Sequence, residues 1–373
     1  MVNRTPAEVF PPGLFLKEEI DARGWTQVEL AEVLGRPARV VSEIILGKRG
    51  ITPETAKGLS AAFGTSAEYW MNLETSYQLT KTNNVEQDIV ARRSCLYGKF
   101  PVKELIKRGW VEFSENIDVL ENNLLSFFEI SSPDEKPTFA YAGKKRDYAN
   151  DSIIQTTWLK RASQISRAVQ AGKFSDNKLP ALLTELKAML EYADSIREIP
   201  ALLAKYGIRL VIIEALPKLE MNGACFWLSP NEPVIALTLA YDRIDNFWFV
   251  LMHELDHIAH GEGKGTPIID NLAPEQQSSN LPEFEKRACD NAASSLIPPE
   301  ELQSFIVRVN PIFSHAQIVG FAKRLRVHPG IVVGQLQNRK IIHWSHHRKT
   351  LESVRDKIIG GVLTDGFGYK LQV

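Results

Sequence analysis

Residues 247–261 of the chain read FWFVLMHELDHIAHG and contain the pattern H-E-x-x-H at His253, Glu254 and His257. On an α-helix, residues four apart lie above one another on one face, so both imidazoles can direct a nitrogen at a single ion. Glu254 follows the first histidine directly, where a carboxylate can take a proton from a water molecule in the site. Large apolar residues flank the pattern on both sides. The stretch therefore predicts a buried helix that carries a zinc site.

A simpler interpretation is that these histidines belong to an ordinary helix and bind nothing, but the apolar flanks favour the metal site. Gly261 is expected to end the helix, and Gly263 and Gly265 to leave the following segment loose. His260, which lies on nearly the same face of the helix, is a candidate for the third ligand. Seven residues at a rise of ~1.5 Å, however, place it ~10 Å along the axis from His253, which is too far for one ion.

The third ligand is therefore expected from another part of the chain. The later segment EFEKRACDNAASSLIPPEEL offers two carboxylates, Glu283 and Glu285. Glu285 heads the apolar face of this predicted helix. Glu283 lies in the first turn, where carboxylates are common because of the helix dipole. Spacing alone leaves the choice between them open.

Composition sets broad limits on the kind of protein. Hydrophobic residues make up 44% of the 373 residues and charged residues 24%, which is typical of a soluble globular protein with two or three domains. The net charge of −1 gives no overall field for nucleic acid or membrane, so any such contact must be local. Cys95, Cys225 and Cys289 form no C-x-x-C pair, which favours reduced thiols in the cytoplasm. We expect no signal peptide and no membrane span.

Short helices are predicted over residues 1–80. Thr26 can cap a helix with Glu29 as its capping-box partner, and a further helix follows after a short turn at residues 38–47. Thr52 can cap the next helix. Helix, tight turn, helix is the spacing in which the second helix of the pair enters the major groove of DNA.

Cationic side chains gather around that second helix. Between residues 36 and 49, four Lys or Arg residues accompany a single acid, although residues 1–80 are not basic overall. Arg39 and Ser42, one turn apart, are candidates for base edges. Gln27, Lys48 and Arg49 suit phosphates better. The predicted DNA-binding set is Gln27, Arg36, Arg39, Ser42, Lys48 and Arg49. The alternative is a four-helix protein–protein module with a solvated basic edge.

Residues 10–80 resemble the Xre/Cro-type domain of HigA-like antitoxins. The matching stretches are LKEEIDARGWTQVELAEVLG, VVSEIILGKRGITPETA and AFGTSAEYWMNLE. The resemblance implies a homodimer that binds operator DNA and represses a toxin–antitoxin operon. Gly-Arg-Pro-Ala-Arg at residues 35–39 departs from the usual lead-in to the recognition helix, so the operator sequence cannot be transferred.

Further along, the pattern changes from helices to strands. Residues 208–216, 224–229 and 233–239 are rich in β-branched and aromatic residues and directly precede the H-E-x-x-H helix. The sequence predicts a multidomain chain of the α plus α+β class. It has four parts: an all-α helix-turn-helix domain over 1–80, a helical connector over 81–194, a zincin-like α+β domain over 195–309 and a helical extension over 310–373.

Residues 195–300 resemble the ImmA/IrrE family of metallopeptidases, through FWFVLMHELDHIAHGE and the later EKRACDNAASSLIP. The resemblance implies zinc ligands His253, His257 and Glu285, with Glu254 as the catalytic residue. Cys289 and Asn291 occupy positions where the family usually has other residues. His328, in the similar stretch HPGIVVGQLQ, could stabilise an oxyanion or merely cap a helix, and lone histidines usually do the latter.

Together these patterns predict a cytoplasmic DNA-binding repressor-antitoxin with a zinc metallopeptidase domain. Its partners would be operator DNA and a protein substrate or cognate toxin, with no membrane contact. One alternative is a non-enzymatic repressor whose ImmA/IrrE-like domain senses a partner or signal. Another is a stand-alone peptidase that uses the helix-turn-helix only for docking. The sequence does not identify the operator or the substrate.

Overall fold

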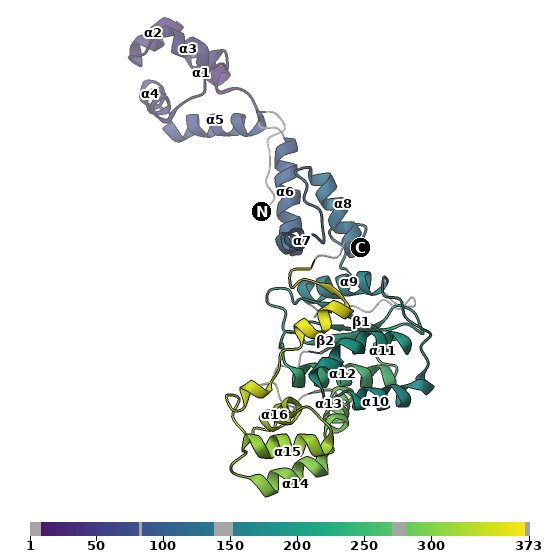
Figure 1. The fold of residues 1–373 in the computed structure, drawn as a ribbon. Coiled ribbons are helices and arrows are strands. Elements are labelled where there is room, and N and C mark those ends of the chain that lie inside the picture. The colour runs from purple at the N-terminus through teal and green to yellow at the C-terminus, as the bar shows by residue number, and fades with distance from the viewer. Residues whose placement is uncertain (1–8, 82–83, 138–151, 271–280, 370–373) are drawn as a thin grey trace. The chain divides into compact units, whose positions relative to one another are not determined.

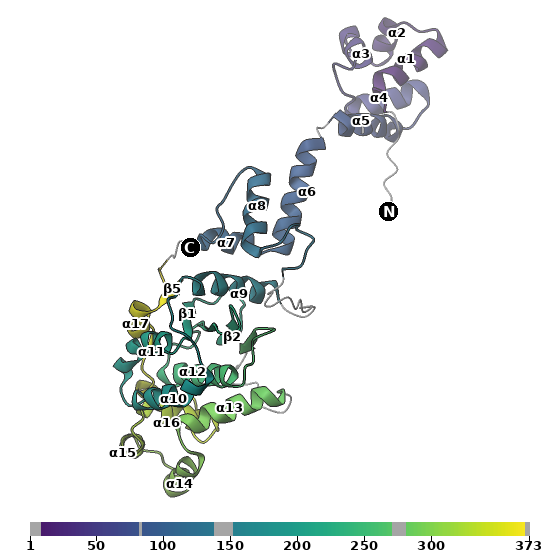
Figure 2. The same ribbon diagram turned by 90° about the vertical axis from the view of Figure 1, so that its right-hand side faces the viewer.

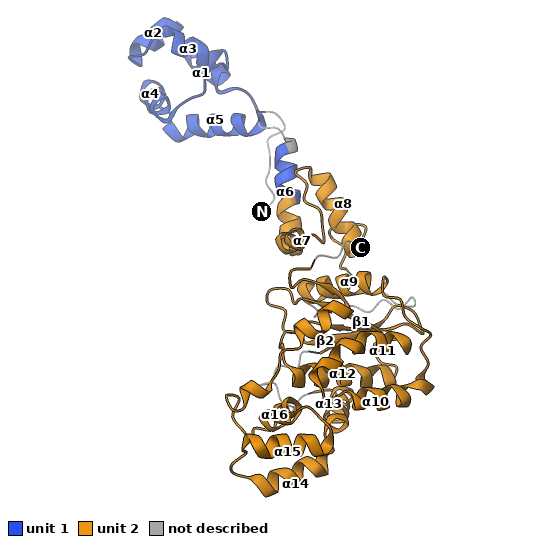
Figure 3. Ribbon diagram, viewed as in Figure 1, with its two compact units in different colours: residues 1–92 blue, residues 93–373 orange. Residues whose placement is uncertain are grey.

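The computed structural model of the 373-residue chain describes residues 9–81, 84–137, 152–270 and 281–369. The chain forms two compact units, residues 1–92 and 93–373 (Figure 3). Residues 144–146, Lys-Lys-Arg, form a short basic run whose composition predicts a solvated loop, and they lie outside the described residues. Among the residues that are described, no helix is long and apolar enough to cross a membrane.

The first unit is helical, as its capping residues predict. Its elements are α1 (Pro12–Arg23), α2 (Gln27–Val33), α3 (Ala38–Ile45), α4 (Pro53–Phe63), α5 (Ala67–Lys81) and the start of α6 (Asn84–Lys99). Thr26 and Glu29 form the expected capping box at the start of α2, and Thr52 caps α4. Apolar side chains from α1 to α5 pack together into one core around Trp70, which is fully buried. Helices α2 and α3 pack together as the helix-turn-helix pair.

The second unit contains most of the helices. They are α7 (Val102–Arg108), α8 (Ile117–Phe128), α9 (Ile153–Ser166), α10 (Leu179–Ala188), α11 (Ile199–Lys205), α12 (Ile244–Ala259), α13 (Glu283–Leu296), α14 (Pro299–Val309), α15 (His315–Leu325), α16 (Pro329–Asn338) and α17 (Arg355–Ile358). One apolar core runs from α10 to α17 and includes strand residues between Leu210 and Leu237. The four-part domain division stays a prediction.

A mixed sheet forms the centre of this unit. Its strands are β1 (Arg209–Ile213), β2 (Gly223–Trp227), β3 (Pro233–Leu237), β4 (Ile268–Asp270) and β5 (Leu363–Asp365), in the order β4-β2-β3-β1-β5. Strand β1 runs parallel to β3 and β5, whereas β2 is antiparallel to β3 and β4. All of β2 and β3 is buried, as expected for strands covered on both faces. The sequence pattern did not predict β5, which is three residues long.

The sheet and its neighbouring helices fix the place of α12. Helix α9 covers one face of the sheet and α12 the other, while α14 and α15 lie beyond α13 and α16 (Figures 1 and 2). Helix α12 packs against α13 and α16 as well as against β2 and β3. Gln335 of α16 donates to the carbonyl of Ala293 on α13 at 2.8 Å. The second unit is therefore a mixed α/β region in which α12 packs against a five-stranded sheet and also against α13 and α16.

Candidate metal centre

Helix α12 presents the H-E-x-x-H residues inward because its flanks are apolar. The predicted core residues of this helix, Phe247, Trp248, Val250, Leu251, Leu255 and Ile258, are all buried. The helix ends at Ala259, and Gly261 follows at φ 67°, the left-handed conformation of a helix stop. His253, Glu254 and His257 have no exposed surface.

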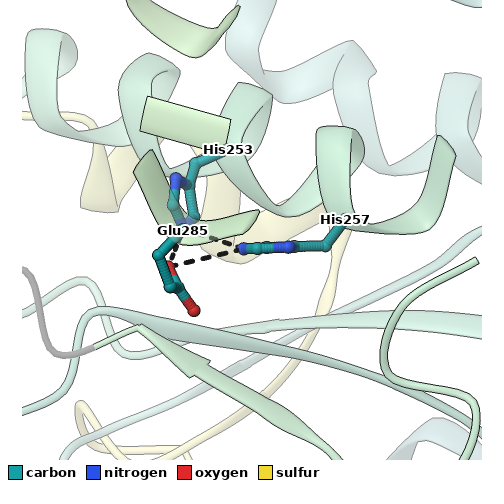
Figure 4. Close-up of side chains that lie close together, drawn as sticks. All are labelled: His253, His257 and Glu285. Atoms are coloured by element: carbon teal, nitrogen blue, oxygen red, sulfur yellow. Dashed lines mark hydrogen bonds and ion pairs between the residues drawn. The ribbon is translucent and has the colours of Figure 1, made fainter. Parts of the chain in front are cut away.

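His253, His257 and Glu285 converge, and their possible ligand atoms all lie within 4.8 Å of one another. Figure 4 shows the Glu285 carboxylate facing both imidazoles. Glu285 Oε2 lies 3.2 Å from His253 Nε2 and 3.7 Å from His257 Nε2, and the two nitrogens are 3.0 Å apart. Tetrahedral zinc with bonds of about 2.0–2.1 Å holds its ligand atoms about 3.3 Å apart. The three side chains therefore fit one small cation with little movement.

Charge interactions favour an ionised Glu285. Burial alone would raise the pKa of this carboxyl, but hydrogen bonds and charge from His253 and His257 lower it to about 2. Burial would lower the pKa of His257, yet Glu285 and Glu262 raise it. The group therefore combines an anionic oxygen with two imidazole nitrogens, a donor set suited to zinc and other divalent transition metals.

Glu254 lies beside the group without belonging to it. Both of its carboxylate oxygens are buried, and neither has a hydrogen-bond partner among the described residues. A Cβ at Gly223, the first residue of β2, would lie 3.0 Å from Glu254 Oε1, a contact tight enough that the carboxylate would have to move by a few tenths of an ångström. Burial, with added repulsion from Asp270 and Glu285, raises the pKa of Glu254 well above its usual value. A buried carboxylate of this kind is typical of a functional site.

Four polar residues around His257 were not predicted from the sequence. Glu262 Oε2 accepts from His257 Nδ1 at 2.6 Å and from Arg287 Nη2 at 2.8 Å. Arg287 Nε also donates to Asp256 Oδ2 at 3.1 Å, and Asn291 Nδ2 donates to Asp256 Oδ1 at 2.8 Å. The one signal for this network in the sequence is the Gly-Glu-Gly turn at residues 261–263.

That turn corrects the expectation that Gly263 leaves the chain loose. Gly263 has φ 79°, and a Cβ there would lie 2.9 Å from the carbonyl oxygen of Cys225. The segment after α12 is therefore packed tightly against β2. A Cβ at Gly265 would meet nothing nearby, so Gly265 is under no such constraint.

The other residues considered as ligands or catalytic groups do not belong to the group of three. His260 is 44% exposed and its Nδ1 pairs with the backbone oxygen of Asp256, in agreement with its exclusion as a ligand. Glu283 is exposed. Burial, with added repulsion from acidic neighbours, raises the pKa of the Cys289 thiol to about 12. His328 is the N-cap of α16 and its Nδ1 accepts from Gly330 N at 3.1 Å, which confirms the capping interpretation.

The predicted DNA-binding residues lie on or beside α2 and α3. Glu43 joins two of them: its carboxylate accepts from Arg39 Nε at 2.7 Å and from Arg49 Nε at 2.9 Å. Arg36 lies 3.5 Å from Glu54. Gln27 and Lys48 are exposed and Ser42 is half-buried. The structure thus places all six in one region of the first unit without testing their roles.

Comparison with known proteins identifies this first region. Residues 16–70 match the family model described as Helix-turn-helix. Virulence-associated protein A' of Dichelobacter nodosus is 41% identical over 71 residues, which are 19% of this chain and 62% of that protein, so the chain spans less than two thirds of this relative. Virulence-associated protein I of the same organism is 35% identical over 88 residues, 23% of this chain and 80% of the relative.

Among solved structures, the Pseudomonas aeruginosa antitoxin HigA with the higBA promoter is 30% identical. The match covers 22% of this chain and 91% of that one, with a TM-score of 0.21. The N-terminal region resembles HigA antitoxins in sequence, and through residues 16–70 the chain belongs to the helix-turn-helix family.

Proposed function

We propose that this protein is a DNA-binding repressor of the antitoxin type that carries a zinc metallopeptidase centre of the ImmA/IrrE kind. The observation that supports the second part is the convergence of His253, His257 and Glu285 at distances that suit one tetrahedral cation. The first part is supported by the helix-turn-helix match and by the HigA structure that was solved with its promoter.

At the metal centre, His253, His257 and Glu285 would hold the ion. A bound zinc would supply Lewis-acid polarisation of a peptide carbonyl. Glu254 is the remaining carboxylate at the site and makes no hydrogen bond with the described residues, so it is free to act as a general base and then a general acid.

At the DNA end, α3 would enter the major groove. Arg39 and Ser42 would read base edges, whereas Gln27, Lys48 and Arg49 would contact phosphates on either side. A homodimer would place two copies of α3 on the half-sites of an operator. Arg36, already close to Glu54, would add a further phosphate contact.

A second function is favoured by one observation. His253, Glu254 and His257 have no exposed surface, which is also how a structural metal site is built. In this second case the zinc would stabilise a domain that senses a partner or signal, and Glu254 would not act on a substrate.

An assay for cleavage of a partner protein distinguishes the peptidase function from the sensing function. The zinc-loaded full-length chain would be incubated with proteins encoded beside its gene, above all a toxin-like one, and compared with Glu254→Gln. The control is Glu283→Gln, which removes an exposed carboxylate from the first turn of α13. We expect cleavage by wild type and control but not by Glu254→Gln. Equal behaviour of all three, with zinc bound, would support the sensing function instead.

A further inference from the structure

We propose that Glu262 is the positioning residue of the metal centre: it orients His257 for the ion and, through Arg287, ties this ligand to the helix that carries Glu285. This inference rests on the proposed metal centre and adds the residues that hold its geometry. Helix α12 supplies both histidines and α13 supplies the carboxylate, so something must fix the two helices relative to each other at this point.

The backbone of Glu262 is anchored on both sides. Its N–H donates to the carbonyl of His257 at 2.9 Å, and its own carbonyl accepts from Trp227 Nε1 at 2.8 Å. Gly261 and Gly263 flank it with φ of 67° and 79°. This left-handed backbone conformation is one that residues other than glycine rarely adopt. The turn therefore brings Glu262 back over the end of α12, next to the helix face that carries His257.

The side chain of Glu262 then decides which nitrogen of His257 faces the centre. An ionised carboxylate only accepts hydrogen bonds, so its 2.6 Å contact places the hydrogen on Nδ1. In the neutral imidazole, the lone pair of Nε2 is then left to face Glu285 and His253. The buried Nδ1 of His253, by contrast, has no hydrogen-bond partner in the part of the chain that the structure describes. Of the two histidines, His257 is the one that the protein orients with a carboxylate, a common arrangement for metal-binding imidazoles.

Arg287 extends the same network to the third ligand. It lies on α13 two residues after Glu285 and donates to both Glu262 and Asp256 of α12. Asn291, one turn further along α13, donates to the other oxygen of Asp256. These three hydrogen bonds join α13 to α12 and its following turn, beside Glu285. The position of Asn291 in this network gives the residue a role in holding the ligands.

Metal affinity tests the proposal without relying on activity. Zinc affinity of full-length wild type, Glu262→Ala and Glu262→Asp would be measured by competition with a chelator, and the cobalt-loaded proteins compared by their visible spectra. The matched control is Glu283→Gln, an exposed carboxylate on α13. Loss of an orienting carboxylate typically weakens metal binding roughly 10–100-fold. We expect that loss for Glu262→Ala, partial recovery for Glu262→Asp, and wild-type affinity for the control.

Arg287→Ala provides a second variant in case Glu262→Ala does not fold. We expect it to weaken zinc binding and to change the cobalt spectrum, because Glu262 loses its second donor. A purely structural role would lower the melting temperature of the metal-free protein and leave zinc affinity unchanged. That result, for whichever of the two variants folds, would overturn the inference.

Failure of the metal centre itself gives a different result. If wild type binds no zinc, or if His253→Ala binds zinc as wild type does, the proposed function fails and this inference fails with it. If wild type binds zinc, His253→Ala does not, and Glu262→Ala still binds with wild-type affinity, only the role of Glu262 is refuted.

Discussion

Two carboxylates in this chain each join a pair of nitrogen-bearing side chains, one at the surface of the first unit and one inside the second. Glu43 joins Arg39 and Arg49, whose side chains are 87% and 52% exposed. Glu285 faces His253 and His257, whose side chains are fully buried. In each group, hydrogen bonds from the two partners lower the pKa of the carboxylate. The chemistry is similar, and burial is what differs.

Burial decides what each group can do. At the surface, water and salt compete with Glu43 for the arginines, so Arg49 can leave it for a DNA phosphate and Arg39 for a base edge at little cost. Inside the second unit, packing holds the imidazoles and Glu285 in place. The first group suits an exchangeable contact with a polyanion, and the second suits a permanent ligand set.

The largest expected effect is on metal binding. His253→Ala removes one of three ligands and should lower zinc affinity by more than the roughly 10–100-fold typical of an outer orienting residue. Metal analysis of the purified protein measures this. His260→Ala, which replaces a histidine about two turns further along whose ring pairs only with Asp256 among the described residues, should keep its zinc. Operator binding should be unchanged in both variants, because the first unit folds around its own core. Equal loss of zinc in both would contradict the assignment.

The next effect concerns a buried ion pair of the second unit. Arg161 of α9 pairs with Asp365 of β5, with side chains 6% and 2% exposed. Asp365→Asn removes the carboxylate charge that faces this guanidinium, and breaking a buried pair from one side costs roughly 3–5 kcal/mol. The free energy of unfolding measures it. Glu232→Gln breaks the more exposed pair with Arg209 and should cost less, about 1 kcal/mol or below. Equal losses of unfolding free energy in the two variants would mean that burial does not determine how much these ion pairs contribute to stability.

A pH-dependent effect is expected at Glu254. Its pKa in the folded protein is raised, so ionising it costs stability that grows as pH rises above about 4.5, the usual value, and levels off above the folded pKa. Glu254→Gln should therefore raise the melting temperature of the metal-free protein at pH 8 and change it little at pH 4. Thermal melts at the two pH values check this sign. A variant less stable than wild type at pH 8 would contradict it.

The smallest effect is expected at the surface pair. Glu43→Gln frees Arg49 for a phosphate and Arg39 for a base edge, so DNA affinity should rise and the slope of log K against log salt should steepen by about one. Titrations at several salt concentrations measure it. Glu68→Gln, which removes an exposed carboxylate from α5, is the control. If both variants give the same slope, Arg39 and Arg49 do not contact DNA.

Local sequence signals predicted much of this molecule. Thr26, Thr52 and His328 cap helices where the pattern places caps, because a cap depends on neighbours within three residues. The spacing of His253 and His257 needed only the period of a helix. The carboxylate that faces them in the structure, Glu285, was named from the family resemblance, since spacing alone left Glu283 open.

The rest depended on contacts between distant segments. Arg287 reaches Glu262 from 25 residues away, and nothing local marks either residue as a partner. Gly263 was expected to be loose because a glycine after a helix is usually flexible, whereas close packing on β2 makes glycine necessary there. Strand β5 pairs with β1 although about 150 residues separate them, and three residues give too short a pattern to recognise.

X-ray absorption at the zinc edge of the full-length chain, loaded with one equivalent of zinc, tests the central claim most directly. The account predicts a first shell of nitrogen and oxygen at about 2.0–2.2 Å, with the outer scattering of two imidazoles. A sulfur shell near 2.3 Å, as from Cys225 or Cys289, or the signature of fewer than two imidazoles, would contradict it.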